Sequence, residues 1–198
     1  MVIKAIIFDW RGVMTEQGKM DNLRKTLAPK FNTTPEKLRP IIKTSWMPAR
    51  IGKLSPKEFW KNIADPLKMD PKDIKKEFLD YVSIRKEVRD LAKKLKKKYK
   101  IALLSNHVEG WLEDELDNFK IRKLFDTITT SYKSKSAKPD SKIYIDAVKS
   151  LKLIPRECIY IDDLEENIHP ANKIGMKGIL FRNTNNLITD LEKLGVKT

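Results

Sequence analysis

Short apolar runs that end in polar residues are the feature that most constrains the fold of this chain. Residues 2–8 form such a run, without a helical period, and the run ends at Asp9. Strands buried on both faces of a parallel sheet have this pattern. Similar runs follow at residues 101–104, 158–161 and 178–181, with a weaker one at 125–130. The sequence therefore predicts the strands of a parallel sheet.

Segments with a helical spacing of apolar residues lie between these runs, at residues 85–99, 141–151 and 185–194. In the second segment the expected buried stripe contains Ile145, Val148 and Leu151. Strands that alternate with helices of this length are typical of a parallel sheet covered by helices on both faces. We therefore predict an α/β protein with three layers.

One long segment interrupts this alternation. Residues 18–82 contain no convincing strand pattern, and they carry three helix starts in which an N-cap side chain precedes a proline and then an acidic residue. The starts are Thr34-Pro35-Glu36-Lys37, Ser55-Pro56-Lys57-Glu58 and Asp70-Pro71-Lys72-Asp73. We therefore expect a core domain of residues 1–17 and 83–198, and an inserted helical cap domain of residues 18–82.

Polar residues follow the apolar runs, at the edge where an open parallel sheet binds its ligands. In chain order they are Asp9, Ser105-Asn106, Lys138-Pro139-Asp140 and Asp162-Asp163. A nucleophilic carboxylate, a hydroxyl, a cation and an acidic pair form a coherent set for phosphoryl transfer. One group attacks, two bind the phosphoryl oxygens, and the acids hold a divalent metal. The sequence thus favours a phosphoryl-transfer site at this edge.

Four segments carry a resemblance to a known family. They are Phe8-Asp9-Trp10-Arg11-Gly12-Val13, Leu104-Ser105-Asn106, Ala137-Lys138-Pro139-Asp140 and Tyr160-Ile161-Asp162-Asp163-Leu164-Glu165-Glu166-Asn167. In order and spacing they resemble the four motifs of the haloacid dehalogenase superfamily, over about residues 1–182. The helical insert resembles the small cap of the phosphoglycolate phosphatase and haloacid dehalogenase branch. The resemblance implies a Rossmann-like core, an aspartyl-phosphate intermediate, and a cap that closes over a small phosphorylated substrate.

The resemblance also implies a role for each residue that handles the phosphoryl group. Asp9 would be the nucleophile. Ser105 would donate a hydrogen bond to the transferring group, with help from the backbone of Asn106. Lys138 would neutralise charge between that group and Asp9.

The same resemblance implies a Mg²⁺ site. Asp9, the backbone carbonyl of Arg11 and Asp163 would bind the metal directly, and Asp162 would do so directly or through water. Two carboxylates, a carbonyl, substrate phosphate and water suit a small, hard cation. Asn167 would tether the loop that follows Asp9.

Arg11 departs from the pattern of the family. Its phosphatases normally carry a second aspartate at this position, which serves as general acid and then as general base. A guanidinium cannot exchange a proton near neutral pH, so a contribution of typically ~10² to 10⁴-fold must come from elsewhere or be missing. The open outcomes are slow turnover of alkyl phosphates, a sugar-1-phosphate or acyl-phosphate substrate, a base supplied by the cap, or ligand binding without turnover.

Three functions remain after this departure, with a Mg²⁺-dependent phosphatase as the first hypothesis. The second is a non-catalytic phospholigand-binding or regulatory protein. The third is a metal-independent 2-haloacid dehalogenase, because those enzymes also lack the second acid; Asp9 would then attack a carbon that bears a halide. The pair Asp162-Asp163 disfavours the third hypothesis, because paired acids suit a metal and would repel an organic acid without one.

Composition and charge exclude several other classes. The 41 Lys and Arg against 27 Asp and Glu give a net charge of +14, but the cations are spread along the chain without a nucleic-acid motif, so we expect no nucleic-acid partner. No apolar run reaches the roughly 18 residues of a membrane span, and no signal-peptide cleavage site is visible. We therefore expect a cytoplasmic protein.

The single cysteine, Cys158, is expected to be buried and inert. The sequence does not define an oligomeric state.

Several aromatic residues invite a functional interpretation. Trp46, Phe59 and Trp60 lie on helical apolar stripes, so we expect them to fill helix interfaces rather than contact substrate. Trp10, which follows the nucleophile directly, is expected to point toward the cap. His107 has no metal-ligand spacing with Cys or a second His, and we assign it no role.

Overall fold

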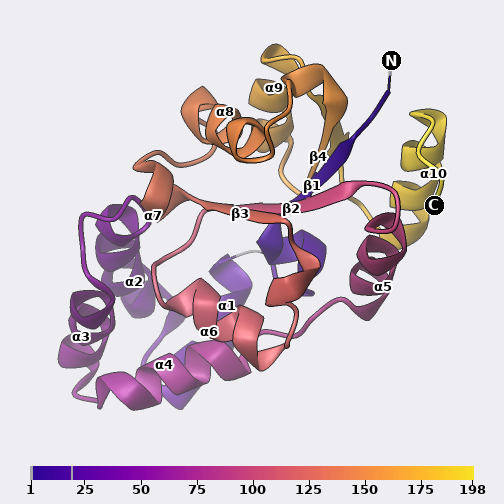
Figure 1. Cartoon of the computed structure of the whole chain (residues 1–198). Coiled ribbons are helices and arrows are strands. Elements are labelled where there is room, and N and C mark those ends of the chain that lie inside the picture. Colours follow the sequence, from indigo (N-terminus) through magenta and orange to yellow (C-terminus); the bar gives the residue numbers. More distant parts are fainter. Residues whose placement is uncertain (1, 19) are drawn as a thin grey trace.

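The computed structural model describes residues 2–18 and 20–198, and its centre is a parallel sheet of five strands (Figure 1). The strands are β1 (Ala5–Phe8), β2 (Lys100–Ser105), β3 (Thr127–Thr130), β4 (Cys158–Asp162) and β5 (Lys177–Leu180). Their order across the sheet is β3-β2-β1-β4-β5, and every neighbouring pair is parallel. Each of the five predicted strands is therefore confirmed, and the strand order changes direction at β1.

Ten helices surround this sheet in the described residues. They are α1 (Met20–Lys30), α2 (Pro35–Ala49), α3 (Pro56–Leu67), α4 (Pro71–Asp80), α5 (Lys86–Leu95), α6 (Trp111–Asn118), α7 (Ser131–Ser134), α8 (Ser141–Ser150), α9 (Glu165–Lys173) and α10 (Thr184–Lys193). Short helical turns also occur at Trp10–Met14, Arg122–Leu124 and Pro155–Glu157.

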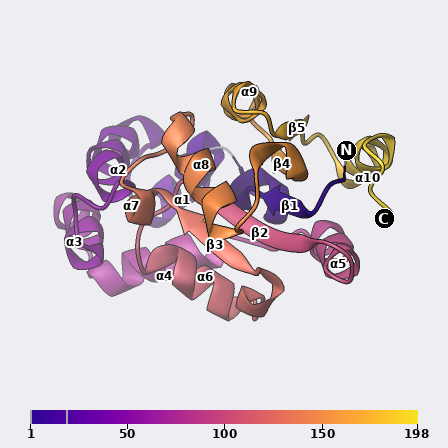
Figure 2. The same cartoon turned by 45° about the horizontal axis from the view of Figure 1, so that its top comes forward.

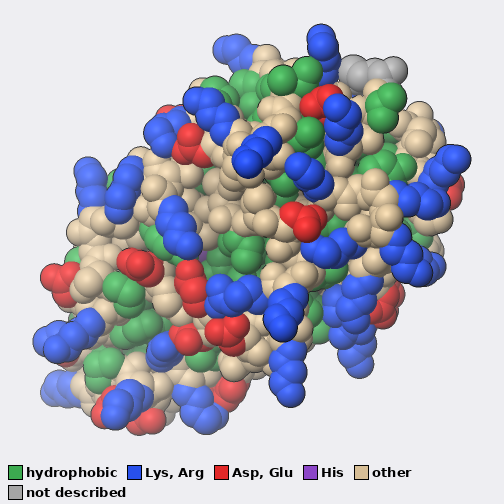
Figure 3. All heavy atoms as spheres, in the orientation of Figure 1, with side chains coloured by type: hydrophobic (Ala, Val, Ile, Leu, Met, Phe, Trp, Pro, Cys, Tyr) green, Lys and Arg blue, Asp and Glu red, His purple; other side chains and the backbone are tan. Residues whose placement is uncertain are grey.

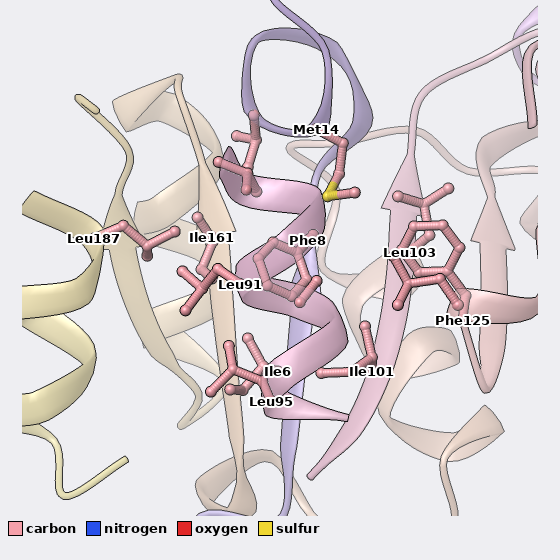
Figure 4. Close-up of a cluster of buried hydrophobic side chains, with 14 of the residues drawn as sticks. Ile6, Phe8, Met14, Leu91, Leu95, Ile101, Leu103, Phe125, Ile161 and Leu187 are labelled. Atoms are coloured by element: carbon pink, nitrogen blue, oxygen red, sulfur yellow. The ribbon is translucent and has the colours of Figure 1, made fainter. Parts of the chain in front are cut away.

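Helices cover both faces of the sheet, which confirms the three-layer α/β architecture (Figure 2). On one face α5, α6 and α10 pack against alternate residues of the strands, and Figure 4 shows Leu91 and Leu95 of α5 facing Ile6 and Phe8 of β1. On the other face α8 and α9 pack against the residues between them, such as Ile7. This alternation follows from the period of two along a strand and explains why the strands are apolar throughout.

The three predicted helix starts are all confirmed. Thr34, Ser55 and Asp70 are the N-caps of α2, α3 and α4, and each side chain accepts a hydrogen bond from the backbone of the first turn. Ser55 forms a complete capping box, because the Glu58 carboxylate accepts the Ser55 amide at 2.9 Å in return. Local interactions therefore define the start of each helix. Proline suits the first helical position because its missing N–H would have no partner within the helix there.

Helices α1 to α4 form a cluster of their own beside the sheet (Figure 1). Its buried side chains include Phe59, Trp60 and Phe78, and α6 contributes Trp111 to the same cluster. The rings of Phe59, Trp60 and Phe78 all lie within 6 Å of the Trp111 ring, centroid to centroid. Phe59 and Trp60 therefore fill helix interfaces as expected, and α6 joins the helical segment to the sheet.

The two connections between the sheet and these helices run side by side. Thr15 and Ile84 form an isolated antiparallel bridge, the amide of Glu16 donates to the carbonyl of Ser83, and the Gln17 side chain bonds Ser83 as well. The chain thus leaves and re-enters the sheet layer through paired backbone segments.

One predicted stripe is partly wrong: Val148 and Leu151 are buried, as expected, but Ile145 is not. Ile145 of α8 is 37% exposed, whereas the buried face of that helix consists of Ile143, Tyr144, Ala147 and Val148. A stripe through Ile143 and Tyr144 packs two apolar residues per turn against the sheet, and it leaves Ile145 about 100° away on the solvent side.

The surface matches the charge pattern of the sequence. Lys and Arg side chains are scattered over the face shown in Figure 3 and are interspersed with acidic residues. Within residues 2–18 and 20–198, no helix combines the length and the apolar character that crossing a bilayer requires.

Candidate active site

The expected site residues meet at the carboxyl ends of three adjacent strands. Asp9 directly follows β1, Ser105 ends β2 and Asp162 ends β4. Because β1 lies between β2 and β4, Phe8 is in register with both Leu103 and Ile161, so the residues that follow emerge together. This is the point where the strand order reverses, and open α/β sheets bind ligands there.

Lys138 is the centre of a buried charge network. Its ammonium nitrogen lies 2.7 Å from Asp9 Oδ1, 2.7 Å from Asp162 Oδ2 and 2.9 Å from the Tyr160 hydroxyl oxygen. Burial alone would lower the pKa of Lys138, but the two carboxylates raise it above its usual value. Lys138 is therefore a charged group that holds Asp9 and Asp162 in one place, as charge-assisted hydrogen bonds do.

Burial is the main reason why the ionised form of Asp9 is disfavoured in the absence of a metal. Burial raises the pKa of the Asp9 carboxyl to about 7; Lys138 opposes this rise, and Asp162 and Asp163 add to it. A divalent cation beside Asp9 would favour its ionised form. The electrostatics of the site thus call for a second cation in addition to Lys138.

Asp162 is fully engaged by the protein. Its carboxylate accepts hydrogen bonds from Lys138, the Tyr160 hydroxyl, the Leu164 amide and the Asn167 side chain, and it is 0% exposed. Burial raises the pKa of Asp162, but Lys138 and the hydrogen bonds outweigh this effect and lower it overall. Asp162 therefore anchors the network from behind the cavity.

Asn167 does not act as expected. Its side-chain amide donates to both carboxylate oxygens of Asp162, at 3.0 and 3.1 Å, whereas we expected it to tether the loop after Asp9. Asn167 lies in the first turn of α9, five residues after Asp162, so its short side chain reaches the end of its own strand first. It stabilises the acidic pair instead of the loop.

Asp163 lies where the loop after Asp9 approaches most closely. A Cβ atom at Gly12, whose φ is +80°, or at Gly18 would collide with the Asp163 carboxylate. Only glycine adopts this conformation without strain and leaves space for the carboxylate. One oxygen from each of Asp9, Asp162 and Asp163 lies within 4.8 Å of the other two, which is a donor set suited to a metal ion.

Asn106 fixes the motif that carries Lys138. Its side chain donates to the Lys138 carbonyl at 3.0 Å and accepts from the Lys138 amide at 2.8 Å. Ser105, which is 1% exposed, lines the cavity beside them. The second and third sequence motifs thus meet through hydrogen bonds between the Asn106 side chain and the Lys138 backbone, as well as at the cavity.

Arg11 faces the same cavity but is bound to a residue of another element. Its guanidinium forms an ion pair with Glu115 of α6, with 2.5 Å between Nη2 and Oε1, and it lies 5.0 Å above the Trp111 ring. Glu115 is 1% exposed. Burial raises the pKa of Glu115, but Arg11 and His107 outweigh this effect and lower it. The residue that departs from the family pattern is therefore paired with a buried, ionised carboxylate.

Two neighbours complete this arrangement. The Trp10 indole nitrogen donates to Glu115 Oε2 at 2.5 Å, and His107 Nε2 lies 3.4 Å from the same oxygen. The expectation that Trp10 points toward the cap is wrong, because Trp10 is 0% exposed in the cluster beneath the sheet. Its indole N–H needs a buried acceptor, and Glu115 is that acceptor.

These side chains surround a cavity of about 140 Å³. Its lining residues are Asp9, Arg11, Gly18, Met20, Trp46, Ser105, Asn106, Trp111, Lys138, Asp163, Leu164 and Asn167. Trp46 packs against Trp111 and His107 and also lines the cavity, so it fills an interface and faces the site at once. Asp162 and Glu115 lie outside the lining and act through Lys138 and Arg11.

Sequence reasoning missed two residues of the site. Tyr160 lies two residues before Asp162 on β4, so the period of two along a strand could have placed both on one face. Glu115 was harder to find, because helix α6 was not expected. Its only signal is an acidic residue on the buried stripe Trp111, Leu112 and Leu116 of that helix.

Comparison with known proteins identifies the family of this chain. Residues 6–181 match the model of the haloacid dehalogenase-like hydrolases. The chain therefore belongs to the haloacid dehalogenase-like hydrolase family.

Its similarities to individual proteins differ in extent. The chain is 31% identical over 106 residues to the bifunctional epoxide hydrolase 2 of Sus scrofa, a match that covers 50% of this chain and 19% of that protein. The chain thus spans about a fifth of the length of that relative. It is 26% identical over 188 residues to the D-ribitol-5-phosphate phosphatase of Bacteroides thetaiotaomicron, covering 89% of this chain and 90% of that enzyme.

Among solved structures, a HAD family enzyme from Bacteroides thetaiotaomicron has the same fold. The TM-score is 0.80 at 23% identity, and the match covers 95% of this chain and 99% of that one. The same enzyme has also been solved in complex with magnesium and inorganic phosphate, with a TM-score of 0.75. This likeness shows that the two chains share their architecture.

Proposed function

We propose that this chain is a Mg²⁺-dependent phosphatase of small phosphorylated compounds that acts through an aspartyl phosphate on Asp9. The observation that carries the proposal is the network in which one ammonium group, Lys138, holds Asp9 and Asp162 at 2.7 Å each, next to the Asp163 carboxylate. The name of the Bacteroides relative, a D-ribitol-5-phosphate phosphatase, supports the same class of substrate. A structural neighbour of this chain was solved in complex with magnesium and inorganic phosphate, and this also supports the proposal.

The residues present fit a magnesium ion. Three carboxylates converge within 4.8 Å, and burial, opposed by Lys138 and assisted by Asp162 and Asp163, raises the pKa of Asp9 to about 7. Asp9, Asp163 and the Arg11 carbonyl would hold the metal directly, and Asp162 would do so directly or through water. When bound, magnesium would neutralise charge on the phosphoryl oxygens.

The chain's own residues would carry the two transfer steps. The Asp9 carboxylate attacks phosphorus, the bond from phosphorus to the ester oxygen breaks, and the alcohol leaves with a proton from water. Water then attacks phosphorus, the bond to Asp9 breaks, and phosphate leaves. Lys138 and Ser105 line the same cavity and would bind the phosphoryl oxygens in both steps.

The cap would cover the cavity in which the phosphoryl transfer takes place. We assign residues 18–82 to a cap domain, and residues 1–17 and 83–198 to the core domain. Met20 and Trp46 of the cap line the cavity with the core residues, and the paired connections around Thr15 and Ile84 would be the hinge. A lid of this kind would keep bulk solvent out of the cavity during the first transfer step, while the water molecule that protonates the alcohol stays inside.

A non-catalytic phospholigand-binding protein is the second candidate, and the Arg11–Glu115 ion pair favours it. This pair occupies the place of the general acid with a guanidinium, and Arg11 helps to lower the pKa of the buried Glu115. The metal-independent dehalogenase fits less well, because three adjoining carboxylates would repel an anionic organic acid in the absence of a cation.

Trapping with beryllofluoride and a phosphate-release screen would test the proposal. We expect beryllofluoride with Mg²⁺ to form an adduct on Asp9, and p-nitrophenyl phosphate to release phosphate only when Mg²⁺ is present. An adduct without turnover of any ester would support the binding protein instead. Halide release from chloroacetate, without phosphate release from any ester, would support the dehalogenase.

A further inference from the structure

Arg11 presents a positive charge to the cavity, and its ion pair with Glu115 fixes the position of that charge. Its side chain is 18% exposed, and Arg11 lines the cavity together with Asp9, Ser105 and Lys138. Because Lys138 is bound to Asp9 and Asp162, it serves the phosphoryl group, whereas Arg11 makes no contact with that network in the hydrogen bonds of residues 2–18 and 20–198. The cavity thus contains two cations in two separate settings.

The guanidinium of Arg11 has donors to spare. Over the same described ranges, its hydrogen bonding consists of one bond from Nη2 to Glu115. An arginine has five N–H donors in a planar fork, and one edge of the fork can bind a carboxylate in a bidentate manner while another is occupied. Glu115 therefore holds the side chain in place without using up its capacity to bind an anion.

The position of Arg11 is determined from three sides. Glu115 pairs with it, Trp10 donates a hydrogen bond to the other oxygen of the Glu115 carboxylate, and His107 Nε2 lies 3.4 Å from that oxygen. The Trp111 ring lies 5.0 Å from the guanidinium carbon, within the range of a cation–π contact. A side chain held in this way loses little conformational freedom when it binds a ligand.

The cavity also limits the size of the ligand. Its 140 Å³ is below the ~300–1,000 Å³ of sites for drug-sized ligands, and Met20, Trp46 and Leu164 give it apolar walls. A phosphoryl group joined to a short carbon chain suits this space, whereas a nucleotide does not.

We infer that Arg11 is the substrate-selecting residue of this site, and that it binds the carboxylate of a small phosphorylated carboxylic acid while Asp9 and Lys138 face its phosphoryl group. The inference rests on the proposed function, because it takes the cavity to be the phosphate-binding site. The inference explains why position 11 carries an arginine: a cation in place of the acid binds the leaving group instead of protonating it.

Binding of two non-hydrolysable ligands in the presence of Mg²⁺ tests this inference without any need for turnover. 3-Phosphonopropionate and propylphosphonate share a three-carbon chain and a phosphonate, and they differ in one carboxylate. We expect calorimetric titration of the wild-type protein to show about 10- to 100-fold tighter binding of 3-phosphonopropionate, the range for a hydrogen-bonded charge pair. Equal dissociation constants for the two ligands would overturn the inference.

Variants then assign the preference to Arg11. In Arg11→Gln the preference should fall to about twofold or less, and in Arg11→Lys to an intermediate value, because an ammonium keeps the charge but cannot bind a carboxylate in the bidentate manner of a guanidinium. Arg122→Gln is the matched control: Arg122 pairs with Asp117 on the surface, so this variant changes the net charge equally and should keep the full preference. A preference that survives in Arg11→Gln would contradict the assignment.

The outcomes also separate this inference from the proposed function. If 3-phosphonopropionate binds selectively and no ester is hydrolysed, the phosphatase proposal fails while Arg11 remains the selecting residue. If esters are hydrolysed and the two phosphonates bind equally, the phosphatase proposal stands and the role of Arg11 fails.

Discussion

The two sides of the cavity differ in which residues surround their cation. On the nucleophile side, Lys138 connects Asp9 and Asp162, and each of these residues lies in one of the four sequence motifs. On the leaving-group side, Arg11 pairs with Glu115, which lies in none of them. The first side carries the groups that we propose for phosphoryl transfer, and the second carries an ion pair at the position where the family resemblance implies a second acid.

This contrast shows that the substitution at position 11 is more than the loss of an acid. An unpaired arginine could simply extend into solvent, but Arg11 has a buried partner whose second oxygen is bound by Trp10 and faces His107. Such a set forms a unit, because removal of one member leaves a buried charge without its partner. Arg11 and Glu115 should therefore be changed together.

The largest effect should come from the nucleophile. Asp9→Asn should lower phosphate release at least about 1,000-fold, because the amide cannot attack phosphorus and no covalent intermediate forms. Steady-state phosphate release with Mg²⁺ would measure this. Asp117→Asn, the same change at an exposed position of α6, is the control and should retain activity. Equal activity of Asp9→Asn and the control would remove Asp9 from the mechanism.

The two ion pairs should differ in their contribution to stability. Lys138→Met leaves two buried carboxylates without a cation and should lower the free energy of unfolding by about 3–5 kcal/mol. Arg11→Met should cost less, about 1–3 kcal/mol, because Glu115 keeps its hydrogen bond from Trp10. Denaturant titration would compare them. A larger cost for Arg11→Met would mean that the leaving-group side is the more essential of the two.

The pH dependence of stability should report on Asp9. Burial raises its pKa in the folded state to about 7, so folded Asp9 holds a proton that unfolded Asp9 has lost above about pH 4. The wild-type protein should therefore lose stability relative to Asp9→Asn as pH rises from about 4 to 7, by up to about 4 kcal/mol without metal.

Denaturant titrations of both proteins across this pH range would measure the difference. Saturating Mg²⁺ should reduce it, because the cation favours ionised Asp9. A constant difference at all pH values would show that Asp9 ionises at its ordinary pKa.

The smallest effect should come from restoring the acid. Arg11→Asp alone places a new carboxylate beside Glu115, and the repulsion between them works against folding and against ionisation of either group. The double variant Arg11→Asp with Glu115→Gln avoids this and should raise the turnover of alkyl phosphates about 10- to 100-fold, part of the usual gain from proton transfer. A single variant that outperforms the double one would contradict the coupling.

Much of the fold could be predicted because its signals are local. Each strand is a continuous apolar run, and Thr34, Ser55 and Asp70 start their helices through side-chain and backbone bonds within one turn. Ile145 was placed on the wrong side of its helix because several stripes of similar apolar content are compatible with one short segment. Packing against the sheet decides between them, and a sequence pattern does not contain that information.

The site was predictable to the same extent. Asp9, Ser105 and Asp162 follow directly from the ends of adjacent strands, because parallel strands bring their carboxyl ends together. Glu115 could not be found in this way, because it is 104 residues from Arg11 in sequence and lies inside a helix. Pairs of this kind depend on how a helix is rotated against the sheet.

The central claim is that Asp9 accepts a phosphoryl group beside a metal while Arg11 stays bound to Glu115. A crystal structure with Mg²⁺ and beryllofluoride would test it most directly. We expect beryllofluoride on the Asp9 carboxylate in contact with Lys138, Mg²⁺ between Asp9 and Asp163, and the Arg11 guanidinium still paired with Glu115. Absence of the adduct from Asp9, or an Arg11 side chain lying in the phosphoryl position, would contradict the account.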